Sequence, residues 1–487
     1  MNISRVSRRH FITSAACSAA ALALSGSNPE TCSAVTLKKK PNILFIPVDD
    51  LRPQLGCYGH TQMFSPNIDR LASEGILFSR TYCQVPVCGA SRASLLTGIR
   101  PTRHRFIDYY TTVDEDMPGA ITLPRYLRDN GYYTISNGKV YHSLRDDRDG
   151  WSEKPWRPRG QWAGRGYLTD ANKRIALDKN YGGRGPAFEV ADVPDNAYQD
   201  GMIADKTIED LQRLAKNDTP FFLAAGFMKP HLPFNAPKRY WDLYKSENID
   251  LTNNPFRPEG APDAALHNWG ELRNYVDIPK EGPLSDNVAR TLIHGYYACV
   301  SYTDAQIGRI LAELGNLGLR DNTIVVLWGD HGWQLGEHGL WCKHSTFELA
   351  LHSPMIVSAP GFSGGKTTRA LTEFVDIFPT LCELCSLSVP DFLQGTSFVP
   401  LMNDPGRAWK KAAFSRYHNG DSIRTDRYRY TEWKREITRV TYSPDIKKYA
   451  RMLYDHEIDP HENINIAERP ENRGLVAELA QMLEDGW

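Results

Sequence analysis

The chain has 487 residues, 41% of them hydrophobic, so it can bury a large core, and its length predicts two or three domains. Its 57 basic and 58 acidic side chains leave a formal net charge of −1, which excludes a broad positive field of the kind that attracts nucleic acid. A polyanionic ligand would have to be bound by a local basic pocket.

Residues 1–37 are predicted to be an export signal and leader. Ser7 to Ile12 contains two adjacent arginines and precedes an apolar run from Ala15 to Leu24, the pattern of a twin-arginine signal. This run is shorter than the ~20 residues that a membrane span needs, so we expect no stable membrane insertion of the mature chain. We therefore predict an exported protein, periplasmic or extracellular, whose mature chain begins between Gly26 and Lys38.

Four apolar segments predict buried strands, and polar residues follow each of them. Asn42 to Val48 is almost wholly apolar, as expected of a parallel strand buried on both faces, and it leads into Asp49 and Asp50. The other segments and the residues after them are 132–135 before Lys139 and His142, 220–226 before Lys229 and His231, and 323–328 before Asp330 and His331. Open α/β sheets bind ligands at the carboxyl ends of their strands, so we expect a site there.

Helical patterns separate these strands, which predicts an α/β fold with a mostly parallel sheet sandwiched by helices over residues 38–405. The predicted helices are 65–75, 122–130, 200–214 and 285–317. Residues 406–487 change to short alternating strands followed by a helix from Asn472 to Leu483. This second region is predicted to be a smaller antiparallel β subdomain.

Two long segments, 145–185 and 232–284, show no clear periodicity. We interpret them as insertions that either wall a substrate pocket or run passively over the surface. The nine cysteines show no pairing pattern, so no disulfide framework is expected. Cys382 and Cys385 have redox spacing, but they end a predicted amphipathic helix, which favours a structural role.

Residues 86–98 present a cysteine among small residues at the start of a predicted helix. Gly89 and Ala90 leave the approach to Cys88 open, and Arg92 adds a cation one helical turn later. Free N–H groups at a helix N-terminus favour an anion, as a reactive thiolate requires. Taken alone, the same residues are equally compatible with a buried core cysteine.

The pattern Cys-x-Ala-x-Arg followed by Leu-Leu-Thr-Gly resembles the signature of type I sulfatases, in which the cysteine is oxidised to formylglycine. Other blocks resemble the iduronate 2-sulfatase branch of that family: Val48 to Pro53, Gly56 to Gly59, Gly138 to His142, Lys229 to His231, Gly329 to Trp333, and Gly336 to Gly339. The resemblance spans most of residues 41–470 and implies an alkaline-phosphatase-like fold.

Three carboxylates, Asp49, Asp50 and Asp330, arrive from strand ends far apart in sequence and would repel one another if left unpaired. A hard cation is their natural partner, although an Asp-Asp pair is also compatible with a strand-end turn. The resemblance implies that calcium is held by these three residues together with His331 and the modified Cys88.

The same resemblance implies the reaction. An aldehyde at Cys88 hydrates to a geminal diol, and one hydroxyl, made more acidic by the cation, attacks the sulfur of a sulfate ester. The second hydroxyl then expels sulfate and regenerates the aldehyde.

Charge and proton transfer are assigned to residues of the same motifs. The motifs offer Arg92, Lys139 and Lys343 as cations for the sulfate. We assign His142 to the formylglycine hydroxyl, and His231 with Lys343 to the sulfate and the leaving oxygen. Lys343 is also the cation that we expect to reach a substrate carboxylate.

We therefore predict an exported, calcium-dependent sulfatase that acts on a sulfated oligosaccharide, with 2-O-sulfated iduronate at a non-reducing end as the favoured substrate. A phosphomonoester or phosphonate hydrolase on the same scaffold and a catalytically silent glycan binder are the alternatives. Ala90 stands where eukaryotic members have proline, which leaves open the maturase that installs formylglycine. Asn137 stands where an apolar residue is usual before Gly-Lys.

Overall fold

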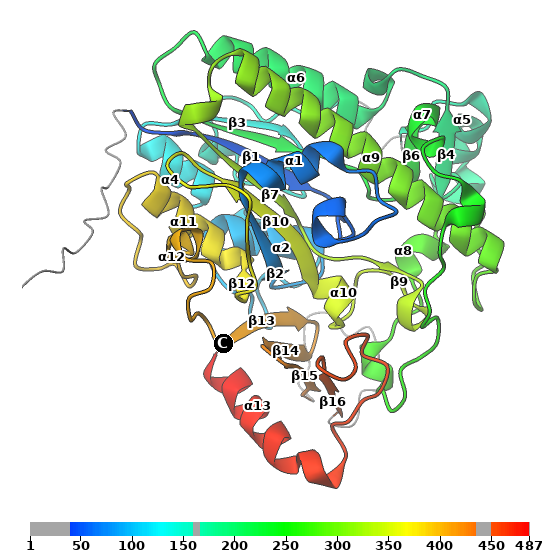
Figure 1. Cartoon of the computed structure of the whole chain (residues 1–487). Coiled ribbons are helices and arrows are strands. Elements are labelled where there is room, and N and C mark those ends of the chain that lie inside the picture. Colours follow the sequence, from blue (N-terminus) through cyan, green and yellow to red (C-terminus); the bar gives the residue numbers. More distant parts are fainter. Residues whose placement is uncertain (1–38, 159–165, 435–449, 487) are drawn as a thin grey trace, which may run out of the picture. The chain divides into compact units, whose positions relative to one another are not determined.

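The computed structural model describes residues 39–158, 166–434 and 450–486 (Figure 1). The predicted export signal and leader, residues 1–37, lie outside the described residues. Among the helices that are described, none combines the length and the apolar character needed to cross a membrane.

An eight-stranded, mostly parallel sheet forms the centre of the described chain, in the order β11-β2-β10-β7-β1-β5-β3 with β12 beside β2. The strands are β1 (Asn42–Val48), β2 (Ile76–Tyr82), β3 (Tyr133–Gly138), β5 (Phe221–Gly226), β7 (Thr323–Gly329), β10 (His352–Ser358), β11 (Lys366–Thr368) and β12 (Thr372–Glu373). β1 pairs in parallel with β5 and β7, and β3 pairs in parallel with β5, whereas β10 is antiparallel to β7 and β2. The four strands predicted to precede polar residues are therefore parallel neighbours.

Helices cover both faces of this sheet, as predicted (Figure 1). Alternate residues of β1 point to opposite sides: Leu44 and Ile46 face one core, and Ile43 and Phe45 face the other. The first core contains α1 (Pro66–Glu74), α6 (Gln199–Leu214) and α9 (Asp286–Asn316), and the second contains α2 (Cys88–Thr97), α4 (Leu123–Asp129) and α11 (Ile377–Leu384). The apolar run of β1 is explained by burial on both faces.

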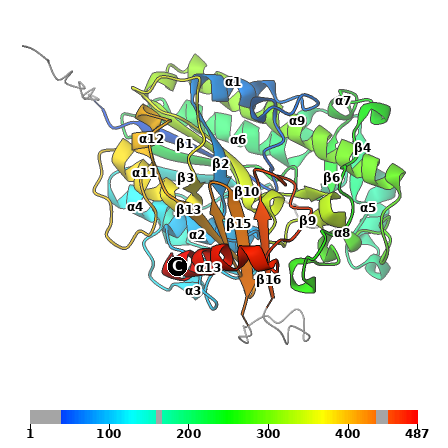
Figure 2. The same ribbon diagram turned by 60° about the horizontal axis from the view of Figure 1, so that its bottom comes forward.

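The C-terminal region forms a separate antiparallel sheet, in agreement with the predicted strands (Figure 2). Its strands follow one another in the order β13 (Ala412–Tyr417), β14 (Gly420–Thr425), β15 (Tyr428–Trp433) and β16 (Ala450–Asp455). Helix α13 (Arg473–Asp485) packs Leu479 and Leu483 against Ile423 and Tyr430 of this sheet. The predicted boundary between the two regions, at residue 405, stays a prediction.

The remaining elements belong to connections and insertions. They are α3 (Val113–Asp116), α5 (Asp170–Leu177), β4 (Phe188–Ala191), β6 (Phe234–Pro237), α7 (Lys238–Trp241), α8 (Gly270–Arg273), β8 (Gln334–Leu335), β9 (Trp341–Cys342), α10 (Glu348–Leu351) and α12 (Val399–Asn403). The sequence did not predict α5, because Ala176 is the single buried residue of that helix and no apolar periodicity results. Parallel pairing of β4 with β6 joins the chain after the first insertion to the second.

Cys382 and Cys385 are free thiols, and both are buried in the core that contains α11. Burial raises the pKa of Cys382 to about 12 and that of Cys385 to about 11. A reactive redox pair needs lowered thiol pKa values, so these residues fit the predicted structural role.

Candidate active site

The carboxyl ends of the parallel strands bring together residues that are far apart in sequence. Asp49 and Asp50 follow β1, and Asp330 and His331 follow β7, whose last residue pairs with the last residue of β1. All four side chains are fully buried. Asp49, Asp50 and Asp330 each offer a carboxylate oxygen within 4.8 Å of the others. The expected cluster at one sheet edge is therefore present.

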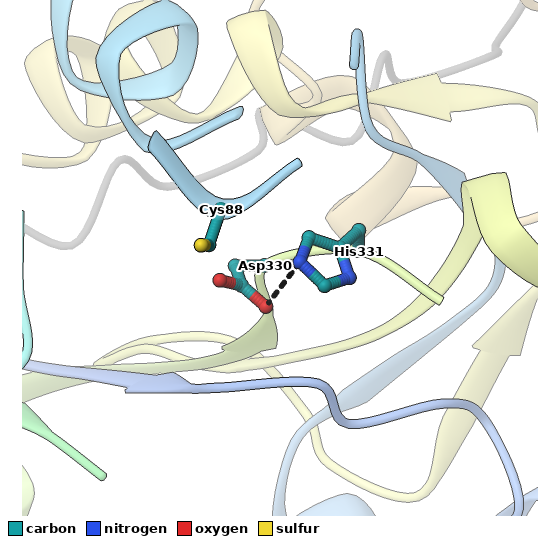
Figure 3. Close-up of side chains that lie close together, drawn as sticks. All are labelled: Cys88, Asp330 and His331. Carbon is teal, nitrogen blue, oxygen red and sulfur yellow. Dashed lines mark ion pairs between the residues drawn. The ribbon is translucent and has the colours of Figure 1, made fainter. Parts of the chain in front are cut away.

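Cys88 is the first residue of α2, and its side chain points toward Asp330 and His331 (Figure 3). A Cβ at position 89 would come within 2.9 Å of the carbonyl oxygens of Asp108 and Tyr109, so glycine there permits a close approach of that loop. Burial raises the pKa of the Cys88 thiol, but the charge of Lys139 and the nearby His331 side chain outweigh this, and the net pKa is lowered. Cys88 is thus a core-buried cysteine whose surroundings favour an anion.

Arg92 and Lys139 lie beneath the nucleophile and not on the cavity surface. Arg92 donates from Nε to Asp330 Oδ2 at 2.9 Å and from Nη2 to Asp49 Oδ1 at 3.3 Å, and Lys139 forms an ion pair with Asp49 Oδ2. Both cations are fully buried. Both cations hold the carboxylates in place, and their expected role toward the sulfate stays a prediction.

The carboxylate cluster fits a hard divalent cation. Asp50 Oδ2 and His331 Nε2 are buried and have no hydrogen-bond partner among the described residues. Asp50 has a left-handed backbone with φ of 60°, an uncommon conformation for an aspartate that is held here by the surrounding structure. Burial, together with the like charges of Asp49 and Glu271, raises the pKa of Asp50 to about 8 despite Lys343 and His231. A bound cation would relieve this unfavourable burial of charge.

A second group of side chains beside this cluster consists of Lys343, His231 and Glu271. Lys343 Nζ lies 2.9 Å from Asp50 Oδ1 and 3.0 Å from Glu271 Oε2, and His231 Nε2 lies 3.0 Å from Glu271 Oε1. Sequence analysis did not identify Glu271. It belongs to the four-residue helix α8 inside an insertion, where no motif or periodicity marked it.

The site contains one cavity of about 740 Å³. Its wall includes Cys88, His142, His231 and Lys343. The insertion 145–185 contributes Arg184, and the insertion 232–284 contributes His267, Asn268, Gly270, Glu271 and Asn274. Both insertions therefore wall the pocket, as one of the two interpretations of them predicted.

Comparison with known families adds an independent observation. The model of the Sulfatase family matches residues 41–387, and the model described as N-sulphoglucosamine sulphohydrolase, C-terminal, matches residues 336–486. The chain belongs to the sulfatase family. Its enzymatic class is thereby shown, since sulfatases hydrolyse sulfate esters.

Relatives of this sulfatase include the iduronate 2-sulfatase of Homo sapiens, which is 33% identical over 87% of this chain and 90% of its own length. A protein named sulfatase from Formosa agariphila is 30% identical over 91% of this chain and 86% of its own length.

Solved structures share the fold. A protein in complex with its substrate, D-glucosamine-2-N,6-O-disulfate, superposes with a TM-score of 0.72 at 26% identity and covers 92% of this sulfatase and 97% of its own chain. The phosphonate monoester hydrolase of Agrobacterium radiobacter also has a TM-score of 0.72, at 24% identity, over 92% of this chain and 95% of its own. The expected alkaline-phosphatase-like α/β fold is confirmed.

Proposed function

We propose that this sulfatase is an exported, calcium-dependent enzyme that removes sulfate from a sulfated saccharide, with 2-O-sulfated iduronate at a non-reducing end as its substrate. The observation that carries the proposal is the position of Cys88 between three buried carboxylates and a cavity lined by His142, His231 and Lys343. Similarity to human iduronate 2-sulfatase over most of the chain supports the choice of sugar.

The metal would be held by Asp49, Asp50, Asp330, His331 and the modified Cys88. Oxygen-rich, anionic donor sets suit Ca²⁺, and His331 adds a nitrogen to this set. When bound, the ion would act as a Lewis acid toward the group at position 88 and the sulfate oxygens. Arg92 and Lys139 keep the carboxylates oriented from below, because each is a buried cation paired with them.

Cys88 would act as formylglycine, which supplies a hydrated aldehyde with one hydroxyl for attack on sulfur and another for release of sulfate. Conversion would require a maturase as a partner of this chain. The thiol of the unmodified residue offers no comparable release step.

Proton transfer would fall to two histidines that line the cavity, His142 and His231. His142 Nδ1 lies 3.1 Å from Cys88 Sγ. Burial and the charge of Lys139 lower the pKa of His142 to about 3, so the imidazole is neutral and one ring nitrogen can accept a hydrogen bond from a hydroxyl at position 88. His231 and Lys343, joined through Glu271, would bind the sulfate and protonate the leaving oxygen.

The test is sulfate release from a defined panel of sulfated sugars. A 2-O-sulfated uronate should be cleaved with kcat/KM at least about a hundredfold above that for a 6-O-sulfated hexosamine, because a site that pairs a carboxylate rejects a sugar without one. Comparable rates on the two sugars would contradict the choice of substrate. Faster hydrolysis of a phosphonate monoester than of any sulfate ester would favour the alternative activity, which shares the scaffold. No turnover of any ester would favour a silent glycan binder.

A further inference from the structure

Some charged side chains on the cavity wall form an ion pair with an acidic residue of the site, and others do not. Lys343 lies against Asp50 and Glu271, and His231 lies against Glu271, so the anions of the site already balance these residues. Lys343, which we expected to reach both the sulfate and a substrate carboxylate, therefore lies beside Asp50 and Glu271.

Three other histidines on the cavity wall carry no charge near neutral pH. Burial lowers the pKa of His267 to about 4 and that of His418 to about 4, and it holds the pKa of His344 well below its ordinary range. These rings can donate or accept hydrogen bonds, but they cannot balance a second anion of the substrate.

Arg184 is different from all of these residues. Its guanidinium lines the cavity and has no ion pair or hydrogen bond with any described residue. It stacks over the ring of Tyr275, with 5.5 Å between the guanidinium carbon and the ring centroid. Tyr275 is fully buried, so the aromatic surface beneath the cation is fixed. Stacking on a ring leaves the N–H groups at the edge of the guanidinium available for an anion.

The backbone around Arg184 is held by both insertions. Val276 N donates to the carbonyl oxygen of the adjacent Gly185 at 3.2 Å, and Ala187 N donates to Asp277 Oδ1 at 2.8 Å. Arg184 N donates to the Tyr181 carbonyl at 3.0 Å. These bonds fix the backbone that carries the cation, which reduces the entropy lost when the side chain binds a ligand.

We propose that Arg184 binds the carboxylate of the sulfated uronate while Cys88 faces its sulfate. This inference rests on the proposed function and names the residue that would select the substrate class. The planar guanidinium matches a carboxylate with two parallel N–H···O bonds, a geometry that lysine does not offer. Arg184 and Cys88 line the same cavity, as binding of one substrate through both of its anions requires.

The experiment compares variants and substrates in parallel. The variants are Arg184→Ala, Arg184→Lys and, as a matched control from the same insertion, Arg174→Ala, whose exposed side chain lies outside the cavity lining. The substrates are a 2-O-sulfated uronate glycoside, its carboxylate methyl ester, a disulfated sugar without a carboxylate, and 4-nitrophenyl sulfate. Thermal unfolding of each variant checks that the fold is intact.

Arg184→Ala should lower kcat/KM for the free uronate by about 10-fold to 100-fold, the range of a hydrogen bond to a charged group. Its kcat/KM for the methyl ester, the disulfated sugar and 4-nitrophenyl sulfate should change less than about threefold. Arg184→Lys should recover only part of the loss, and Arg174→Ala should behave as wild type. Equal losses on acid and ester, or a loss confined to the disulfated sugar, would overturn the carboxylate assignment.

A second measurement separates failure of this inference from failure of the proposed function. The unsulfated uronate should inhibit 4-nitrophenyl sulfate turnover competitively, and Arg184→Ala should weaken that inhibition about 10-fold or more. If the wild-type enzyme does not cleave the sulfated uronate, the proposed function fails, yet inhibition that depends on Arg184 still supports the binding role. Inhibition that is equal in wild type and Arg184→Ala would refute that role whatever the enzyme cleaves.

Discussion

Cys88 Sγ and His142 Nδ1 lie 3.1 Å apart, although the residues are 54 positions apart in the chain. Arg157 supports this contact by holding the backbone of the loop that carries His142. Its guanidinium donates to the carbonyl oxygens of Gly138 at 2.9 Å, His142 at 3.0 Å and Tyr141. The loop that carries His142 is therefore fixed at both ends. Arg157 was not predicted from sequence, since its role depends on carbonyl groups of a separate segment.

His142→Ala should lower kcat/KM for an aryl sulfate by about 10² to 10⁴, the usual contribution of a positioned general base or acid. Peptide mass spectrometry should show the same modification at position 88 as in wild type, because His142 lies outside the sequence motif around Cys88. Wild-type turnover by fully modified His142→Ala enzyme would contradict the assigned proton transfer.

Position 88 should carry formylglycine in the mature protein. The peptide that contains it should be about 18 Da lighter than the cysteine form, since a CH₂SH group becomes an aldehyde. Cys88→Ala should abolish turnover and leave the fold intact, because a small buried residue is replaced by a smaller one. Full activity in protein with only the unmodified thiol would disprove the mechanism.

Asp330→Asn should lower activity by orders of magnitude, because it removes one of the charges that hold the cation. In wild type, added Ca²⁺ should raise the thermal midpoint of demetallated protein, since a ligand bound only by the folded state stabilises it. That shift should shrink in Asp330→Asn and persist in Asp218→Asn, where the carboxylate is exposed. Full activity after complete removal of metal would show that the ligand assignment is wrong.

Glu271→Gln should lower kcat/KM for an aryl sulfate by about 10-fold to 100-fold, because the charged acceptor that positions His231 and Lys343 is lost. Glu281→Gln serves as the control, since this exposed residue lies in the same insertion but not on the cavity wall. Similar kinetics for both variants would show that Glu271 does not position the catalytic pair.

Glu348→Gln should lower the free energy of unfolding by about 3 kcal/mol, as expected when a buried ion pair loses one partner. Glu348 in α10 binds Arg424 and Arg429 of the C-terminal sheet, and Arg429 is almost fully buried. Urea denaturation would measure the change. Glu468→Gln removes an exposed partner of Arg451 and should change the same quantity by less than about 1 kcal/mol. Equal effects would show that the buried pairs add no particular stability.

Local pattern was sufficient to predict the sheet and the cluster of carboxylates at its edge. The apolar runs of β1 and β7 are long enough to identify buried strands, and parallel strands place their carboxyl ends at one edge. Asp49 and Asp330 therefore had to lie near each other once both strands were assigned. The motif around Cys88 identified the family, because its small residues and Arg92 have a fixed spacing along one helix.

Tertiary structure alone decided which charged residues line the cavity. Arg92 and Lys139 are paired with buried carboxylates and are not among the residues that line it. Glu271 and Arg184 reach the cavity from insertions without periodicity. Their positions depend on the pairing of β4 with β6 and on the hydrogen bond from Val276 N to the Gly185 carbonyl. These contacts join segments that are distant in the chain, so the local sequence pattern does not indicate them. Charge type is a property of the sequence, whereas the partner of each charge is set by long-range packing.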